Sequence, residues 1–302
     1  MNAATNILRI AAAQYPIERF KTLAEYKAKL SRWVGEAVGV GTQLLVFPEY
    51  GAMEYAGAAG TAASSLRDSL TITADAMVEM GTVHAELARR HRIHILAASG
   101  PCKLEDKSYV NRATLYAPSG SGAHQDKMIM TPFERDWGIS PGSELRVFET
   151  AIGAIGVAIC YDSEFPLLVR ALVEAGADII LIPSCTEFAS GYHRVRTAAM
   201  ARALENGCVT VQSPTVGEAQ WLPAVDRNYG AAGIYVPAEH SLSDTGVVSE
   251  GIPGAAQWVC GAMDMAELVR VRSAGEMRNS RDWNLQPGAA PLAEKAMRIA
   301  LA

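Results

Sequence analysis

The sequence shows neither the long apolar segment expected of a membrane protein nor the pattern expected of a signal peptide. Its longest apolar stretch of note, residues 151–160, is ten residues long, whereas a helix needs about 20 residues to span a bilayer. Only Arg9 precedes the short apolar run at 10–13, which is not the pattern of a signal peptide. We therefore expect a cytoplasmic protein without a membrane partner.

An excess of positive charge is also lacking. The chain has 27 Lys and Arg against 32 Asp and Glu, which gives a net charge of −5, and its basic residues form no stripe. A nucleic-acid-binding surface needs concentrated positive charge. We therefore expect no nucleic-acid partner.

Cysteines are few and irregularly spaced. The five cysteines are odd in number and include no Cys-x-x-Cys pair, which argues against a disulfide framework and a cysteine zinc site. His91 and His94 have no cysteine or carboxylate beside them in a zinc-binding pattern, so no metal is expected there. The G-x-S-x-G elbow, the P-loop and a complete G-x-G-x-x-G are absent as well.

The composition is that of a globular protein, with 49% hydrophobic and 20% charged residues among 302. Apolar runs alternate with helical patterns, which predicts an α/β protein whose strands are covered on both faces. We expect one domain over 1–302, with a tail from about 265 that shows no clear pattern and an ordered loop at 127–142. The predicted strands are 7–14, 43–47, 93–99, 109–116, 146–150, 154–159, 178–182, 209–212, 230–236 and 257–262. The predicted helices are 22–40, 65–91, 164–175 and 193–205.

Three predicted strands end in residues suited to chemistry, and active groups of α/β proteins gather beyond the carboxyl ends of strands. Glu49, Cys160 and Cys185 stand at these ends. Cys160 has the better context of the two thiols, because Asp162 or Ser163 is placed to cap the following helix, whose dipole would lower the thiol pKa. An inert buried cysteine is the alternative.

The same reasoning applies to Glu49. Burial at the end of an apolar run would raise the pKa of its carboxyl and suit it to proton transfer. A solvated loop carboxylate is an equally typical reading of the pattern.

Three separated sequence blocks resemble those of a known family. They are 44–50 (LLVFPEY), 126–142, which contains the short motifs DK, PFE and PG, and 156–166 (GVAICYDSEFP). Together and in this order they resemble the nitrilase, or carbon–nitrogen hydrolase, superfamily, over residue 7 to about 283. The resemblance implies a four-layer α-β-β-α sandwich, usually assembled into dimers or higher homo-oligomers through a helical face.

The resemblance also implies roles for single residues. Glu49 is expected to be the general base, Lys127 the cation that stabilises an oxyanion, and Cys160 the nucleophile. Glu134 corresponds to a second glutamate that positions the substrate. Substrate contacts are expected from Tyr161 and Thr186, and no metal or organic cofactor is implied.

The expected reaction is hydrolysis of a small carboxamide to an acid and ammonia through a cysteine thioester. True nitrilases have Trp and Glu after the cysteine, whereas Tyr161 and Asp162 resemble the amidase and carbamoylase branches. N-carbamoyl compounds and nitriles remain alternative substrates. The sequence has no arginine shortly after the cysteine that could recognise a substrate carboxylate. Arg135 or Arg194 is a candidate for that role.

Two other classes of function stay open, a catalytically silent binding protein and a redox-sensing thiol protein. A homo-oligomer is expected from an apolar stripe on the predicted helix 164–175. The alternative is that this stripe only covers the protomer's own sheet. The stripe consists of Leu167, Leu168, Ala171 and Leu172.

Overall fold

Two β-sheets pack face to face, and helices cover the outer face of each. The computed structural model describes residues 7–286 and 296–301. The first sheet contains β1 (Ile7–Pro16), β2 (Leu44–Val46), β3 (His94–Leu96), β4 (Gly100–Lys103), β5 (Tyr109–Tyr116), β6 (Gly122–Asp126) and β14 (Gln257–Asp264). The second contains β7 (Leu145–Thr150), β8 (Gly153–Val157), β9 (Ile179–Ser184), β10 (Val209–Glu218), β12 (Gly233–Tyr235), β13 (Val247–Glu250) and β15 (Ala296–Ala300).

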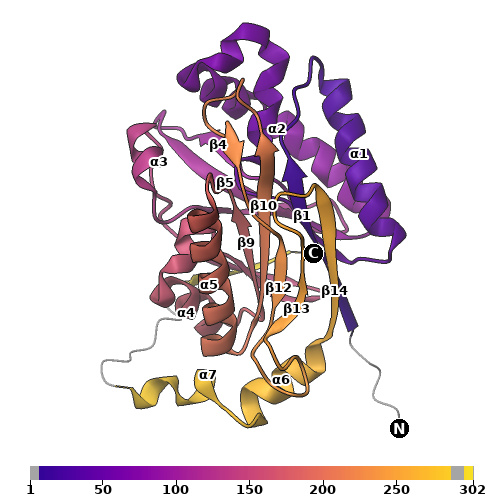
Figure 1. Cartoon of the computed structure of the whole chain (residues 1–302), viewed down its shortest axis with the longest axis vertical. Helices are drawn as coiled ribbons and strands as arrows, with labels where there is room; N and C mark the ends of the chain where they lie inside the picture. The colour runs from indigo at the N-terminus through magenta and orange to yellow at the C-terminus, as the bar shows by residue number, and fades with distance from the viewer. Residues whose placement is uncertain (1–6, 287–295, 302) are drawn as a thin grey trace.

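The two sheets are joined at one corner. The end of β1 pairs in parallel with β10 at Tyr15 and Thr215, and the short β11 (Arg227–Asn228) pairs with the end of β10. Helices α1 (Leu23–Gly39) and α2 (Leu66–His91) cover the first sheet, and α4 (Pro166–Glu174) and α5 (Ala189–Asn206) cover the second. Figure 1 shows α1 and α5 on opposite sides of the strands. The order of layers is therefore α-β-β-α.

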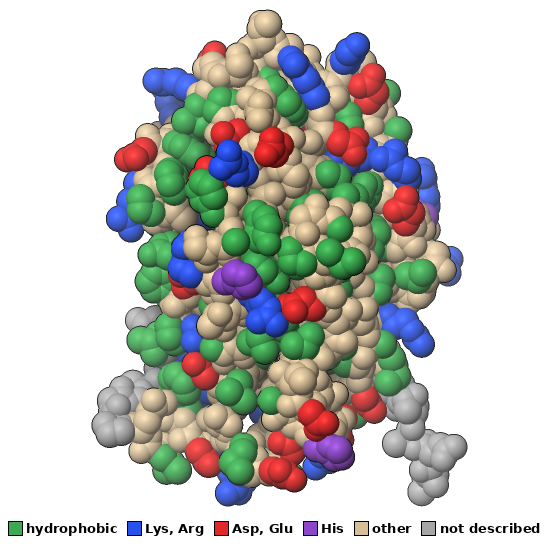
Figure 2. Space-filling model, viewed as in Figure 1, with side chains coloured by type: hydrophobic (Ala, Val, Ile, Leu, Met, Phe, Trp, Pro, Cys, Tyr) green, Lys and Arg blue, Asp and Glu red, His purple; other side chains and the backbone are tan. Residues whose placement is uncertain are grey.

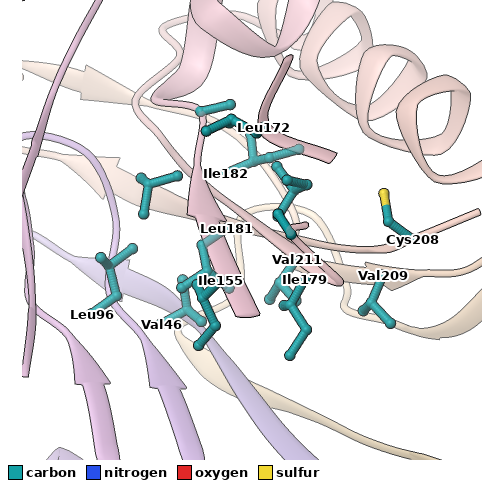
Figure 3. Packing of buried hydrophobic residues seen from close by; sticks show 14 of the residues in the cluster. Val46, Leu96, Ile155, Leu172, Ile179, Leu181, Ile182, Cys208, Val209 and Val211 are labelled. Atoms are coloured by element: carbon teal, nitrogen blue, oxygen red, sulfur yellow. The ribbon is translucent and has the colours of Figure 1, made fainter. Parts of the chain in front are cut away.

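Alternation along β1 explains how one strand serves two cores. Side chains of a strand point to opposite faces in turn, so Leu8 and Ile10 face the second sheet while Ala11 and Ala13 face α1 and α2. Between the sheets, the aliphatic side chains of Val46, Leu96, Ile155 and Leu181 pack together in Figure 3. This apolar interior fixes the spacing of the strand ends.

The predicted elements are present, with differences at their boundaries. The predicted helix at 164–175 begins at Pro166, and residues Cys160–Glu164 form a separate 3₁₀ turn, η2. Helix α5 begins four residues before the predicted 193. The predicted loop 127–142 contains a short helix, α3 (Pro132–Asp136). The long 3₁₀ segment η1 (Gly51–Ser64) follows β2 and was not predicted.

The C-terminal part, for which the sequence shows no pattern, adds a strand to the second sheet and packs α7 against α5 and α6. It contains α6 (Met265–Ala274), α7 (Asn279–Asp282), η3 (Trp283–Leu285) and β15, which pairs in parallel with β7. The predicted tail at 265–302 and the predicted domain at 1–302 include residues 1–6, 287–295 and 302, which lie outside the described residues.

The surface mixes charges of both signs. On the face drawn in Figure 2, basic and acidic side chains are interspersed. Within residues 7–286 and 296–301, no helix has the length and apolar character needed to cross a bilayer.

A buried ion pair ties the first sheet to its covering segments. The Nζ of Lys29 on α1 lies 2.8 Å from Oε2 of Glu54 on η1, and both side chains are only 1% exposed. Lys29 also donates to the carbonyl of Pro16 and lies 3.9 Å above the ring of Tyr15. The Tyr15 hydroxyl donates to Oε1 of Glu54 at 2.6 Å. These contacts hold η1, and with it the segment after Glu49, against β1.

We predict that Glu54→Gln lowers the free energy of unfolding by about 3–5 kcal/mol, because it removes the buried counter-charge of Lys29 and leaves only the half-exposed Glu18, whose Oε1 lies 3.7 Å from Nζ. Urea denaturation of the variant and the wild type measures this change. Glu267→Gln is the control, since its partner Arg270 is half exposed and exposed pairs contribute little. Equal unfolding midpoints for the two variants would contradict the prediction.

Candidate active site

A cavity of about 420 Å³ lies beyond the ends of β2, β6, β8 and β9. It gathers residues that are far apart in the sequence, because these strands end close together. Aromatic side chains, among them Phe133, Trp137 and Phe188, form part of its wall. All six residues predicted for the site line it: Glu49, Lys127, Glu134, Cys160, Tyr161 and Thr186.

The ammonium of Lys127 lies between two carboxylates at the bottom of this cavity. Its Nζ is 2.7 Å from Oε1 of Glu49 and 2.6 Å from Oε2 of Glu134, and all three side chains are at most 2% exposed. Burial alone would lower the pKa of Lys127, but the charges of the two glutamates raise it. The lysine therefore stays positively charged.

Glu134 is surrounded by donors. Besides Lys127, its carboxylate accepts hydrogen bonds from the Tyr50 hydroxyl (2.8 Å), from Nδ2 of Asn111 (3.1 Å), and from the amide and hydroxyl of Thr131 (3.0 Å each). Burial opposes ionisation, but Lys127 and these donors hold the pKa of Glu134 below its ordinary value. This glutamate is a fixed negative charge.

Glu49 has fewer donors and the opposite shift. Its carboxylate accepts from Lys127, from Nδ2 of Asn111 (3.0 Å) and from the amide of Cys185 (2.9 Å). Burial raises the pKa of Glu49, and the attraction of Lys127 only partly offsets this. The prediction of a buried glutamate with a raised pKa is confirmed in its direction. Two carboxylates on one lysine thus differ in proton affinity, which is how a site separates a proton carrier from a fixed charge.

Cys160 is the first residue of η2, and its side chain lies beside that of Glu49. Its thiol points at the carbonyl of Cys185, with 3.9 Å between Sγ and oxygen, and the residue is 5% exposed. Its φ of 47° is in the left-handed region, where a side chain is strained. Burial, followed by the charge of Glu49, raises the pKa of Cys160 well above its ordinary value.

The predicted lowering of this pKa by a helix dipole is therefore wrong. Helix α4 begins at Pro166, and its N-cap Phe165 makes no side-chain capping bond, so Cys160 is separated from the helix by the η2 turn. Ser163 does not cap the helix but donates from Oγ to the carbonyl of Cys160 at 2.6 Å. Asp162 is also not the cap, since its carboxylate accepts from backbone amides elsewhere. In the resting site the thiol is protonated, and its activation needs a base.

The two residues predicted to contact substrate lie on the cavity wall. The ring of Tyr161 packs edge-on against Phe165, with 4.9 Å between ring centroids. The hydroxyl of Thr186 donates to the carbonyl of Tyr229 at 2.7 Å, so its proton is directed to the backbone. Its remaining lone pair and its methyl group are what Thr186 can offer to a ligand.

Sequence reasoning missed the polar side chains that hold the glutamates. Asn111 on β5 donates to both carboxylates, and Ser99 donates to its Oδ1 at 2.7 Å. The amide of Tyr50 in turn donates to Oγ of Ser99 at 3.0 Å. An asparagine within the partly alternating strand predicted at 109–116 is the available signal for this network.

The structure shows where the two candidate arginines lie and whether side chains that could bind a metal ion come together. Arg194 lines the cavity, with its Nε 3.3 Å from a carboxylate oxygen of Glu164, whereas Arg135 is exposed and is not one of the lining residues. In the part of the chain that the structure describes, no group of three or more His, Cys, Asp or Glu side chains is placed to hold a metal ion.

The α-β-β-α layering matches the fold of solved nitrilase-superfamily structures, so the predicted fold class is confirmed. The crystal structure of a carbon–nitrogen hydrolase from Helicobacter pylori superimposes with a TM-score of 0.73 and 18% identity, over 94% of this chain and 96% of that one. The family model for carbon–nitrogen hydrolase matches residues 9–243. The chain therefore belongs to the carbon–nitrogen hydrolase family.

Two further proteins are similar to this chain. A probable hydrolase, YhcX of Bacillus subtilis, is 34% identical over 277 residues, which cover 91% of this chain and 53% of YhcX. The chain thus spans about half the length of that relative. A double mutant of an amidase from Nesterenkonia sp. AN1, solved in complex with acrylamide, has a TM-score of 0.66 and 18% identity, over 95% of this chain and 100% of that one.

We predict that Cys160 carries no thiolate at neutral pH and that Glu49→Gln lowers the pKa of its thiol, because the variant removes the negative charge that opposes ionisation. The ultraviolet absorbance of thiolate, followed against pH as the difference between each protein and its Cys160→Ala form, measures this pKa. The subtraction removes the signal of the other four cysteines. A titration midpoint that stays in place or rises in Glu49→Gln would contradict the prediction.

Proposed function

We propose that this protein is an amidase that hydrolyses a small carboxamide to an acid and ammonia through a thioester on Cys160. The observation that carries the proposal is the buried set of a protonated thiol, a glutamate of raised pKa beside it, and a lysine held positive by two carboxylates. These groups line one cavity. They supply a nucleophile, a proton carrier and a fixed positive charge.

In the proposed mechanism Glu49 takes the proton of the Cys160 thiol as Sγ attacks the amide carbon. The developing oxyanion is stabilised by the ammonium of Lys127 and by the backbone N–H of Tyr161. Glu49 then gives its proton to the departing nitrogen, and ammonia leaves. A thioester remains, and Glu49 activates a water molecule that hydrolyses it, which restores the thiol.

Glu134 contributes by holding Lys127 in this mechanism. Its five donors keep it ionised, so it does not compete with Glu49 for the proton. Its charge also keeps the lysine protonated when Glu49 is neutral during the reaction. Substrate contacts are proposed for Tyr161 and Thr186 on the wall.

The choice of an amide over a nitrile follows from two considerations. Tyr161 and Asp162 stand where true nitrilases have Trp and Glu, and an amide nitrogen needs a proton in order to leave, which Glu49 holds after activating the thiol. The similar Nesterenkonia structure is that of an amidase with acrylamide. An N-carbamoyl compound is the second candidate, since its cleavage needs the same groups. Of the two predicted arginines only Arg194 lines the cavity, and there it is paired with Glu164, so a substrate carboxylate would have to compete with Glu164 for it.

We expect ammonia release from a panel of aliphatic and ω-amides, and loss of that release in Cys160→Ala, because the thiol of Cys185, which also lines the cavity, donates to Oδ1 of Asn228 and not to Glu49. Acid formation from each amide is compared with that from its matched nitrile and its N-carbamoyl analogue. Cys185→Ala is the matched control, because Cys185 contributes its backbone amide rather than its thiol to Glu49. Faster acid formation from the nitrile would reject the amidase assignment, and inertness towards every compound would favour a silent binding protein.

We also propose a homo-oligomer, but from exposed leucines of the outer helices and not from the predicted stripe as a whole. Ala171 and Leu172 of the predicted stripe are buried within the protomer's own core, so the stripe as a whole does not indicate a subunit contact. Leu167 on α4 is 61% exposed and Leu204 on α5 is 43% exposed. These two leucines leave an apolar surface on the outer helical layer.

Light scattering is expected to give at least twice the chain mass of 32.2 kDa, and Leu167→Glu is expected to lower that mass, because a buried charge in the contact is costly. A value of one chain mass for the wild type at micromolar concentration would refute the oligomer. Leu285→Glu is the control, because Leu285 is exposed but lies in the C-terminal η3 segment.

A further inference from the structure

Asp162 joins the two segments that carry the proposed nucleophile and oxyanion donor. Its Oδ1 accepts from the amide of Ile129 at 2.8 Å, and its Oδ2 accepts from the amide of Met128 at 3.1 Å. Oδ2 also accepts from the amide of Ile159 at 3.3 Å. The first two amides belong to the two residues after Lys127, and the third belongs to the residue before Cys160.

The chemistry of this junction needs a carboxylate. All three partners are N–H donors, and a carboxylate is the side chain that offers acceptors on both oxygens. Asp162 is fully buried, and burial raises its pKa to about 7 although Lys127 lowers it. The negative charge of Asp162 in turn helps to keep Lys127 protonated. An asparagine of the same shape would aim an NH₂ group at a backbone donor.

The other contacts of both segments make this junction effective. The amide of Lys127 donates to the carbonyl of Asn111 at 2.9 Å, and the carbonyl of Lys127 accepts from Gly142 at 2.7 Å. On the other side, the amide of Asp162 donates to the carbonyl of Ile159 at 3.0 Å, which closes the turn around the strained Cys160. Each segment is thus anchored by itself, and Asp162 sets the distance between them.

We propose that Asp162 is a positioning residue, which fixes the ammonium of Lys127 relative to Sγ of Cys160 in the geometry that the oxyanion requires. This inference rests on the proposed amidase function. The oxyanion exists only along the reaction path, so the effect of Asp162 falls on kcat rather than on KM. A shift of about 1 Å in such a site costs on the order of 100-fold in rate.

The test is a double-mutant cycle on the full chain with the best amide of the panel. Asp162→Asn is expected to lower kcat about 10- to 100-fold with little change in KM, and Lys127→Met to lower it about 100-fold or more. Because Asp162 acts through Lys127, the double variant is expected to be no slower than Lys127→Met alone. Ser163→Ala removes a hydrogen bond of the same turn without touching the lysine segment. It is expected to lower kcat by less, roughly 2- to 5-fold.

Three results would overturn the proposal: near-normal kcat in Asp162→Asn, losses that multiply in the double variant, or a Ser163→Ala loss as large as that of Asp162→Asn. If Asp162→Asn does not fold, Asp162→Glu carries the test. It keeps both acceptors and lengthens the junction by one methylene, so kcat is expected to fall with KM retained. A folded Asp162→Glu with full kcat would show that Asp162 is structural only. Failure of the amidase function is a different result, in which the wild type itself releases no ammonia.

Discussion

The buried ammonium of Lys127 is the contact on which the site depends. Without it, Glu49 and Glu134 would be two like charges in a space from which water is excluded, and such carboxylates do not both stay ionised. With it, two segments far apart in the chain, the end of β2 with Glu49 and the loop with Lys127 and Glu134, converge within hydrogen-bond distance. Asn111 completes the arrangement, because its uncharged amide also donates to both carboxylates. The cluster of Lys127, Glu49 and Glu134 therefore carries a net negative charge, and each of its charged groups has a hydrogen-bond partner.

The sandwich supplies the rigidity that such a cluster needs. The aliphatic side chains between the sheets fill the interior and fix where β2, β8 and β9 end. Each of the segments that follow is then held by hydrogen bonds to another. The amide of Cys185 donates to Glu49, and the amides of the two residues after Lys127 donate to Asp162. A buried ionic group is costly unless its partners are held in place beforehand. The packing of the core and the chemistry of the site are thus linked through the strand ends.

Much of this arrangement could be predicted from the sequence, for a physical reason. Apolar runs mark strands whatever their partners are, and groups at the ends of strands meet at one edge of a sheet. Glu49 and Cys160 were therefore accessible to local reasoning, whereas Lys127 and Glu134 needed the family resemblance, because a lysine and a glutamate in a Pro-containing loop carry no local sign of burial. The contacts of Asn111 and the raised pKa of Cys160 depend on partners many residues away. No helix dipole lowers the thiol pKa, because a separate turn, η2, precedes the helix, and the sequence does not show this turn.

The backbone of Cys160 has a consequence for how this protein can change over time. A φ of 47° is a conformation that glycine adopts freely, so most substitutions that would relax this turn remove the sulfur. Tyr50, next to Glu49, has a φ of 53° and the same conflict. Selection for a more stable chain and selection for turnover therefore pull in opposite directions at these two positions. A lineage that lost its substrate would be free to replace Cys160 with glycine, and that exchange in a homologous sequence would mark a copy of the fold retained for some purpose other than catalysis.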